Sequence, residues 1–391
     1  MQRLQRLRRD EAGMSYVFVG LGLMGLLSAS MLAIDVGMLM TARNQAQNSA
    51  DAGALAGATA LVFDSFTDRS PDGPVVRSAL AGSRGNRVMG GQVAVESGDV
   101  SFPVDPFGEA NRVQVNVYRT AARGNPLSLL IARYFGMESA DISATATAEA
   151  SRATGMTCVK PFTIPDKWRE VGNPPWDGSD TYDAFNNRGE PLPPSTADVY
   201  IPANQPGYTG YNQESNRGQE LVLRAGTGEN ITVSFYYSLA MPQTTGGVPI
   251  TGGAEYDWNI ANCNRSVMHW GDLMTQEPGN MVGPTVQGIE ALIARDPTAR
   301  WDTTTNRVIN SAFGGQQSPR VFPIPLFDPP YYDAGKRNGR NADLKVANWI
   351  GFFADRVVGN QIYGRIIPIA GIRDGAPVPD GLTIRSIRLV R

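Results

Sequence analysis

Residues 14–34 read MSYVFVGLGLMGLLSASMLAI, a run of 21 residues without a charged side chain. At about 1.5 Å per helical residue, this run is long enough to cross the roughly 30 Å hydrocarbon core of a bilayer. Asp35 follows the run, and four arginines precede it: Arg3, Arg6, Arg8 and Arg9. Because basic residues favour the cytoplasmic side of a membrane, we expect residues 1–13 to be cytoplasmic and the bulk of the chain to lie outside.

A cleaved signal peptide is the alternative interpretation of this segment. It would use Arg8 and Arg9 as the basic region, residues 16–27 as the apolar region, and Ser28-Ala29-Ser30 as the small-residue cleavage site. The apolar run continues beyond that site to Ile34 without a helix breaker. This length favours a retained membrane helix.

Small residues recur along one face of this helix and of its continuation. A spacing of four allows another helix backbone to approach closely, which predicts a transmembrane packing face at Gly25, Ala29, Ala33 and Gly37. Spacings of three and four then predict a helix to about Val62 with a seam of Leu39, Ala42, Ala46, Ser49, Gly53, Ala56 and Ala60. The seam suits either a partner helix or the chain's own globular body.

Three strings occur around this helix in a distinctive order. Residues 8–13 read RRDEAG, residues 33–37 read AIDVG, and residues 45–58 read QAQNSADAGALAGA. This order resembles the TadE/G-like N-terminal segment of TadG-like proteins, which belong to bacterial tight-adherence (Flp pilus) assembly systems. The resemblance implies an inner-membrane, pilin-like anchor with a periplasmic body. It also implies other pilus-assembly proteins or pilins as partners, besides the lipid bilayer.

The sequence departs from the family in two places. Relatives that a prepilin peptidase cuts have a Glu five residues after the cleavage-site Gly, whereas Phe18 stands at that offset from Gly13. An uncleaved N-terminus is therefore expected, with a processed minor pilin as the alternative. Relatives often end in a von Willebrand A domain with an Asp-x-Ser-x-Ser metal site. The nearest string, at residues 177–181, follows two prolines in a loop, so no metal site is predicted.

The remaining chain predicts an α+β fold. A pilin-like α+β unit is expected over residues 63–152, with helices at 74–82 and 126–135 and strands at 113–117 and 142–148. A β-rich extracytoplasmic domain is expected over 153–391. Its predicted helices are 285–295 and 344–355, and its predicted strands are 219–224, 231–237, 320–326, 365–369 and 382–390.

The two cysteines, Cys158 and Cys263, would then lie in an oxidising compartment, where we expect them to form a disulfide.

The composition leaves little room for catalysis. With one histidine and two cysteines, the chain cannot build the usual zinc sites, and a net charge of −2 disfavours nucleic-acid binding. A Ser266–His269–Asp272 triad has no Gly-x-Ser-x-Gly elbow around its serine. The acids that could pair for glycoside cleavage read as solvated loop residues: Asp166, Glu170, Asp177, Asp180, Asp183 and Glu190. We expect no catalytic residue, cofactor or metal.

The sequence thus predicts a non-catalytic, membrane-anchored component of tight-adherence pilus assembly. It would engage other pilus or envelope proteins through its transmembrane helix and its periplasmic body. A secreted or surface adhesin that binds carbohydrate is the alternative, and an envelope hydrolase using His269 or an acid pair is a further one.

Overall fold

The computed structural model describes residues 2–390 apart from 187, 227–229, 234, 244–249, 338–343 and 376–377, and apart from the side chains of residues 2–12, 31–32 and 336–337. The chain divides into two compact units. The first consists of Met1–Glu149 and Ile387–Arg391, and the second of Ala150–Ser386.

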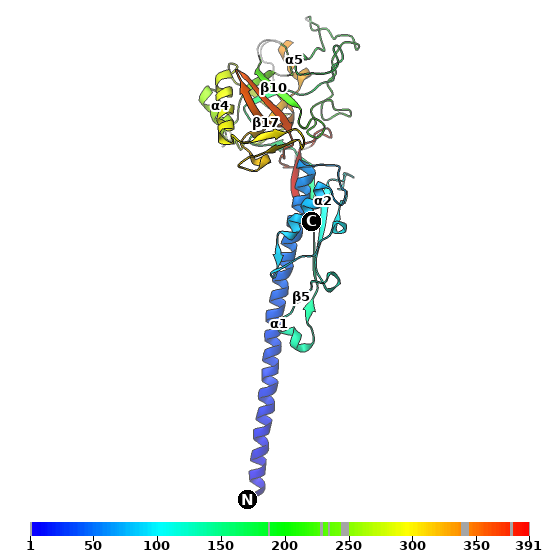
Figure 1. The fold of residues 1–391 in the computed structure, drawn as a ribbon, viewed down its shortest axis with the longest axis vertical. Coiled ribbons are helices and arrows are strands. Elements are labelled where there is room, and N and C mark those ends of the chain that lie inside the picture. The colour runs from blue at the N-terminus through cyan, green and yellow to red at the C-terminus, as the bar shows by residue number, and fades with distance from the viewer. Residues whose placement is uncertain are drawn as a thin grey trace. The chain divides into compact units, whose positions relative to one another are not determined.

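A long helix, α1, runs from Gln2 to Phe63 (Figure 1). No proline interrupts it, and the strong helix formers alanine, leucine and methionine recur along its length. It ends where the sequence becomes polar ahead of Pro71. The second helix, α2 (Pro74–Arg84), begins with a proline in its first turn, where a missing N–H removes no helical hydrogen bond.

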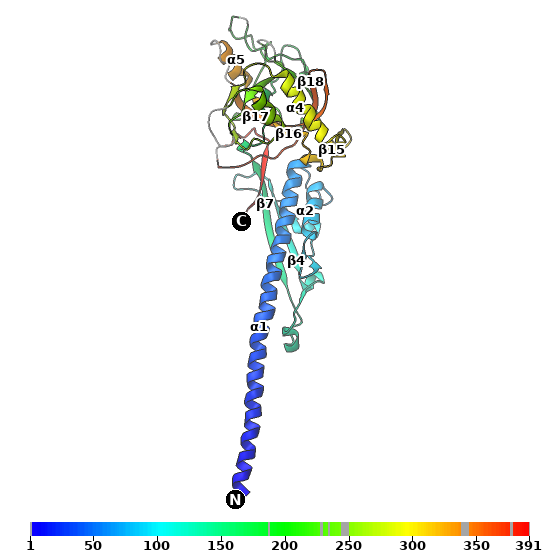
Figure 2. The same ribbon diagram turned by 90° about the vertical axis from the view of Figure 1, so that its left-hand side faces the viewer.

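The first unit also contains a four-stranded sheet of order β19-β7-β4-β3, and Figure 2 shows β4 and β7 alongside α1 and α2. Strand β4 alternates between buried and half-buried positions, and its buried valines face the helices. The strands are β3 (Val100–Ser101), β4 (Arg112–Arg119), β7 (Ile142–Arg152) and β19 (Arg385–Val390).

Short hairpins and 3₁₀ turns complete this unit. They are β1 (Arg87–Val88) with β2 (Gly91–Gln92), β5 (Leu127–Ser128) with β6 (Ser139–Ala140), and the turns η1 (Ser97–Asp99), η2 (Ala121–Arg123) and η3 (Ala132–Phe135).

The second unit is built on a seven-stranded sheet of order β10-β18-β17-β13-β11-β9-β16. Further pairings of β10 with β11 and of β16 with β17 fold this sheet back on itself in a barrel-like arrangement. The strands are β9 (Phe162–Pro165), β10 (Glu220–Ala225), β11 (Phe235–Ala240), β13 (Leu273–Gln276), β16 (Val321–Phe327), β17 (Leu344–Val358) and β18 (Gln361–Ile367).

Smaller elements surround this sheet. They are the pairs β8 (Gly155–Met156) with β12 (Met268–His269) and β14 (Arg300–Asp302) with β15 (Arg307–Ile309), the helices α3 (Gly253–Ala261), α4 (Val282–Arg295) and α5 (Pro329–Arg337), and the turn η4 (Gly315–Gln317).

The core of the second unit is rich in aromatic side chains. Phe162 packs edge-on against Phe322 with ring centroids 6.2 Å apart, and Phe322 contacts Phe352 at 5.8 Å. Trp168 and Trp349 are both almost fully buried. Such large apolar side chains give a β-rich unit most of its buried area, which is the dominant favourable term in folding.

The predicted fold class, α+β with a long N-terminal apolar helix followed by a β-rich domain, is confirmed. Two predicted helices are wrong. Residues 344–355 belong to β17, where nearly every side chain is buried and a continuous apolar run cannot reveal a strand period. Residues 126–135 form β5 and the 3₁₀ turn η3. Three of their backbone N–H groups, those of residues 130–132, bond to Asp35 and are not available to an α-helix.

One further difference concerns the C-terminal residues. The sequence-based boundary assigns everything after residue 152 to the second domain, whereas β19 joins the sheet of the first unit beside β7. Strand pairing between segments so distant in the sequence leaves no local pattern.

Candidate functional site

The N-terminal part of α1 is exposed around its circumference. Among the described side chains from Gly13 to Ile34, Ser30 is half-buried and all others are exposed. By length and composition, this helix is able to cross a membrane. Because so continuous an apolar surface is unfavourable in water, lipid or another protein must cover it.

The predicted packing face lies on this exposed part. Gly25, Ala29, Ala33 and Gly37 are all exposed, and a Cβ added at Gly25 or Gly37 would meet no atom within 4 Å. The face is therefore open to a second helix. Its occupation by one stays a prediction. The side chains of Arg3, Arg6, Arg8 and Arg9 lie outside the described residues.

The predicted seam lies on the C-terminal part of α1 and is covered by the first unit itself. Ser49 donates a hydrogen bond to the backbone oxygen of Ser83 in α2 at 3.0 Å, and a Cβ added at Gly53 would lie 2.9 Å from the backbone oxygen of Ala79. Of the two interpretations left open by the sequence, the structure favours packing on the chain's own body. The buried members are Ala42, Ala46, Ser49, Gly53 and Ala60, and Leu39 and Ala56 are half-buried.

Asp35 is where α1 changes from one environment to the other. Its side chain is 4% exposed, although it directly follows the apolar run. The carboxylate accepts hydrogen bonds from the backbone N–H groups of Leu130 at 3.0 Å, Ile131 at 3.1 Å and Ala132 at 2.6 Å. These bonds hold the η3 loop against α1 and compensate the burial of the charge. The sequence does not reveal this role, because the partners of Asp35 lie up to 97 positions away along the chain.

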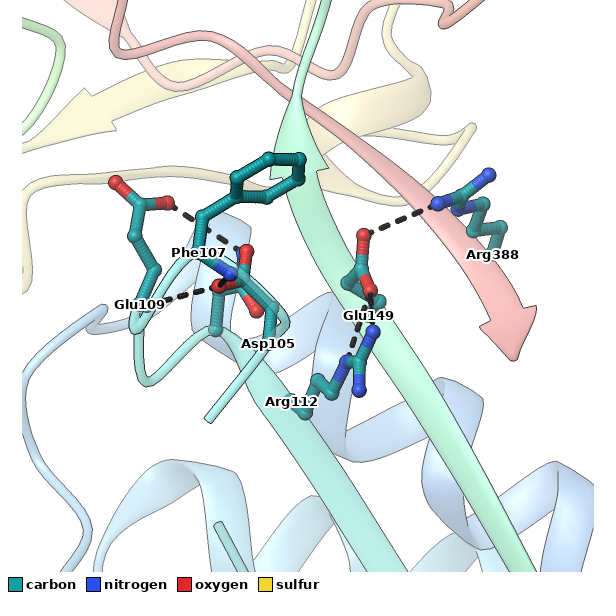
Figure 3. Close-up of polar contacts among 7 residues, drawn as sticks. Asp105, Phe107, Glu109, Arg112, Glu149 and Arg388 are labelled. Atoms are coloured by element: carbon teal, nitrogen blue, oxygen red, sulfur yellow. Dashed lines mark hydrogen bonds and ion pairs between the residues drawn. The ribbon is translucent and has the colours of Figure 1, made fainter. Parts of the chain in front are cut away.

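A buried carboxylate also holds the sheet of the first unit together. Glu149 in β7 accepts two hydrogen bonds from Arg112, at 2.7 and 2.9 Å, and one from Arg388 in β19 at 3.2 Å (Figure 3). Its side chain is 4% exposed. Charge-assisted bonds of this kind are stronger than neutral ones. Glu149 therefore ties β19 to the middle of the sheet.

A tight loop precedes β4 in the same view (Figure 3). Asp105 accepts hydrogen bonds from the backbone N–H groups of Phe107 at 2.8 Å and Glu109 at 2.9 Å, and from the side-chain amide of Asn111 at 2.9 Å. The loop leaves the Phe107 ring 84% exposed.

Residues 13–60 match the family model described as "Putative Flp pilus-assembly TadE/G-like". This segment is TadE/G-like. No curated protein and no solved structure matches the chain. The TadE/G-like segment covers both parts of α1, the exposed apolar part and most of the part packed on α2 and β4, and includes Asp35.

The triad drawn around His269 does not assemble. The His269 Nε2 atom lies 2.5 Å from an oxygen of Asp374, and its Nδ1 atom lies 3.6 Å from Asp272. The Ser266 hydroxyl donates instead to the backbone oxygen of Gln243 at 2.9 Å. The imidazole thus faces two carboxylates, which orient it without activating that serine.

Asp166 is fully buried rather than solvated, contrary to the sequence-based expectation for the acids of residues 166–190. Its carboxylate accepts hydrogen bonds from the hydroxyls of Tyr208 at 2.6 Å and Tyr200 at 3.0 Å, and from the backbone N–H groups of Tyr211 and Lys167, both at 2.9 Å. Burial raises the pKa of Asp166 to about 6, although these bonds act in the opposite direction. The arrangement is that of a satisfied structural polar network.

Other acids of this group also accept hydrogen bonds from neighbouring residues of the chain. Asp177 accepts bonds from the backbone N–H and the hydroxyl of Ser179 at 2.7 and 2.6 Å, and Glu170 accepts one from the Trp168 indole at 3.2 Å. Burial raises the pKa of Asp180 and that of Asp183. Among the described residues, no group of three or more His, Cys, Asp or Glu side chains is arranged to hold a metal ion.

The two cysteines are brought together in the second unit. Cys158 and Cys263 form a disulfide with Cα atoms 4.3 Å apart, across 105 positions of the chain.

Proposed function

We propose that this chain is a single-pass, non-catalytic component of tight-adherence pilus assembly, anchored in the bacterial inner membrane by residues 14–34. Residues 1–13 would lie in the cytoplasm, and the two folded units in the periplasm. One observation carries this proposal. The TadE/G-like segment forms a single helix whose N-terminal part is apolar and exposed, and whose C-terminal part packs on the first unit.

This division assigns separate roles to the two parts of α1. The packed part fixes the helix to the first unit. The exposed part carries the small-residue face of Gly25, Ala29, Ala33 and Gly37, through which the chain would contact another membrane helix of the pilus system. The folded body would contact further pilus or envelope proteins.

Orientation is supported by the charges that flank the apolar run. Arg3, Arg6, Arg8 and Arg9 precede it, and the positive-inside rule assigns such clusters to the cytoplasm. The Cys158–Cys263 pair supports a periplasmic body, because disulfides persist in oxidising compartments. Action by binding is supported by the Ser266 hydroxyl, which donates to the backbone oxygen of Gln243 and not to His269. It is also supported by Asp166, whose carboxylate is held by the Tyr200 and Tyr208 hydroxyls.

The packing face is tested by crosslinking in cells that carry the pilus system. Gly25→Leu and Ala29→Leu would each place a large side chain on the face, and crosslinks between this chain and other membrane-embedded pilus proteins are expected to be lost. Gly20→Leu is the matched control, because five positions turn the helix about 140° away from Gly25 and Gly20 is equally exposed. Unchanged crosslinks in the Gly25 and Ala29 variants would remove the face from the proposal.

The anchor itself is tested by the mature N-terminus and by fractionation. An N-terminus near Met1 in the inner-membrane fraction is expected. A start near Met14 would indicate prepilin-type cleavage and a minor pilin, and a start near Met31 in soluble fractions would replace the anchor with a secreted adhesin.

A further inference from the structure

We propose that the loop of residues 129–137, here called the interface loop, docks on the lipid headgroup region of the membrane that α1 spans. The proposal rests on the membrane anchoring proposed above. It gives the first unit a second attachment to the bilayer, which would hold that unit at a defined height and tilt.

The interface loop is fixed in place. Asp35 accepts backbone hydrogen bonds from three successive residues of the loop, Leu130, Ile131 and Ala132, and the side chains of Leu129 and Ala132 are buried. Gly136 ends the 3₁₀ turn with φ near +89°, a conformation that favours glycine. The loop is thus a preformed element rather than a loose connection.

This fixed loop directs apolar side chains outward. The exposed fractions are 53% for Leu130, 76% for Tyr134, 51% for Phe135 and 51% for Met137. Four large apolar side chains within eight positions are a costly surface to leave in water. On α1, Ile34 and Val36, the sequence neighbours of Asp35, are exposed as well.

Asp35 sets the height of the loop along α1. Asp35 is the first residue after the apolar run 14–34, so the loop is held where the helix leaves the hydrocarbon core. In both Figure 1 and Figure 2 the turn near β5 lies alongside α1 and reaches toward its N-terminal end. The Asp35 carboxylate is covered by the loop backbone, which removes the cost of presenting a charge to lipid at this depth.

The exposed groups of the loop have both polar and apolar parts. Arg133 donates a hydrogen bond to the Tyr134 hydroxyl at 3.2 Å, and its guanidinium lies 5.1 Å from the centroid of that ring. Tyrosine and arginine have apolar bodies and polar ends, the combination that concentrates at membrane–water interfaces. The cationic group also suits the phosphates of anionic lipids. These features favour a lipid surface over a protein partner.

The test uses the full chain in nanodiscs of phosphatidylethanolamine and phosphatidylglycerol. Because both native cysteines are in the disulfide, a spin label on Met137→Cys reports from the loop while leaving Tyr134 and Phe135 in place. Its depth is read from collisions with oxygen, which enters lipid, against collisions with a water-soluble nickel chelate. Phe107→Cys is the matched control, an exposed apolar site on another loop of the same unit. Leu23→Cys, in the apolar run, reports whether α1 is in the bilayer.

We expect the label at residue 137 to collide more with oxygen and less with the nickel chelate than the label at residue 107 does. This difference should disappear when Tyr134→Ser and Phe135→Ser are combined. Equal behaviour at residues 137 and 107 would overturn the proposal. If residue 23 is buried in lipid in that case, the anchor stands and the loop alone fails. If residue 23 is also exposed to nickel, the membrane anchor is wrong as well.

Asp35 has a separate part in the proposal as the group that positions the loop. Asp35→Ala should withdraw the residue 137 label from lipid and broaden its range of motion. Asp51→Ala is the control on the same helix, because Asp51 accepts a hydrogen bond from Gln47 one turn earlier. An unchanged depth in the Asp35 variant would show that the loop does not depend on this carboxylate.

Discussion

Gly57 of α1 lies so close to Val113 of β4 that a Cβ added at Gly57 would be 2.7 Å from the Cγ1 atom of Val113. Real Cβ atoms essentially never approach a neighbour this closely. The same added atom would lie 3.2 Å from the Cβ of Ala79 in α2. The absence of a side chain at Gly57 therefore allows α1 to contact the sheet and α2 at one point.

This contact predicts that Gly57→Leu separates α1 from β4. Overpacking typically costs about 1–3 kcal/mol. Because the Cβ alone would already clash with Val113, we expect the upper part of this range for a leucine, which exceeds the roughly 1 kcal/mol that a helical Gly→Leu change returns in helix propensity. Hydrogen exchange of the β4 and α2 backbone in detergent-solubilised protein should become faster. Gly20→Leu, on the exposed part of α1, should leave that exchange unchanged, and equal rates in the two variants would contradict the predicted packing.

Glu149 is expected to hold β19 to the rest of the sheet. Glu149→Gln removes the negative charge between Arg112 and Arg388, whose side chains are 22% and 51% exposed. Because both arginines retain some contact with water, we expect the free energy of unfolding of the first unit to fall by about 2 kcal/mol. This is less than the cost of breaking a fully buried ion pair. Exchange at residues 385–390 should rise most.

A matched comparison within the same group sharpens that result. Arg112 donates two bonds to Glu149 and Arg388 donates one, so Arg112→Ala should destabilise the unit more than Arg388→Ala. Glu138→Gln, at an exposed position of the same unit, serves as the control. If the backbone amides of β19 exchange equally fast in these three variants and in Glu149→Gln, then Glu149 does not hold β19 to the sheet.

The Cys158–Cys263 disulfide predicts a large share of the stability of the second unit. Closing a loop across 105 positions contributes about 4–5 kcal/mol on the chain-entropy model. All six tryptophans lie in this unit, at 168, 176, 258, 270, 301 and 349, so their fluorescence follows its unfolding in urea without interference from the first unit. The Cys158→Ala/Cys263→Ala variant should unfold at lower urea concentration, and wild-type protein under reducing conditions should match it. A variant as stable as the oxidised protein would contradict the prediction.

Asp166 predicts how the stability of the same unit depends on pH. Its pKa rises from 3.8 to about 6 on folding because the carboxyl is buried. Between about pH 4 and pH 6 the folded state holds a proton that the unfolded chain has released, so the stabilisation is complete below this window and is lost as pH rises through it. The shift corresponds to about 3 kcal/mol.

The check is a urea titration by tryptophan fluorescence at several pH values. Asp166→Asn should flatten the decline across the window, because the side chain then no longer ionises. Asp302→Asn is the control. Hydrogen bonds from Thr305 and Thr304 lower the pKa of Asp302, so its contribution to stability increases with pH, opposite to that of Asp166. If the decline persists unchanged in the Asp166 variant, another group carries it. Asp198 is then the first to examine, because burial raises its pKa to about 6 as well.

Prediction from sequence succeeded where the signal lies in neighbouring residues. The apolar run 14–34, the alternation of β4 and the helical period of α4 each require only local order, and each element appears close to its expected bounds. It failed for β17 because a strand buried on both faces loses its period of two. It failed for residues 126–135 because Asp35 takes up the N–H groups there.

The candidate site divides in the same way. The small-residue face and the seam were recognisable from spacing, but spacing does not specify what covers them. That the seam is covered by α2 and β4 follows from Gly53, Gly57 and their neighbours in space. The roles of Asp35 and Glu149 depend on partners that the sequence does not mark.

By itself, the sequence determined the apolar span, its TadE/G-like character, the α+β class and the cysteines available for pairing, because these depend on composition and on the order of adjacent residues. Only the tertiary structure decided that α1 packs on its own body, that β19 returns to the first sheet, and that Asp35 holds a loop 97 positions away. Such contacts are set by the free energy of the whole packed unit, which no local stretch of the chain encodes.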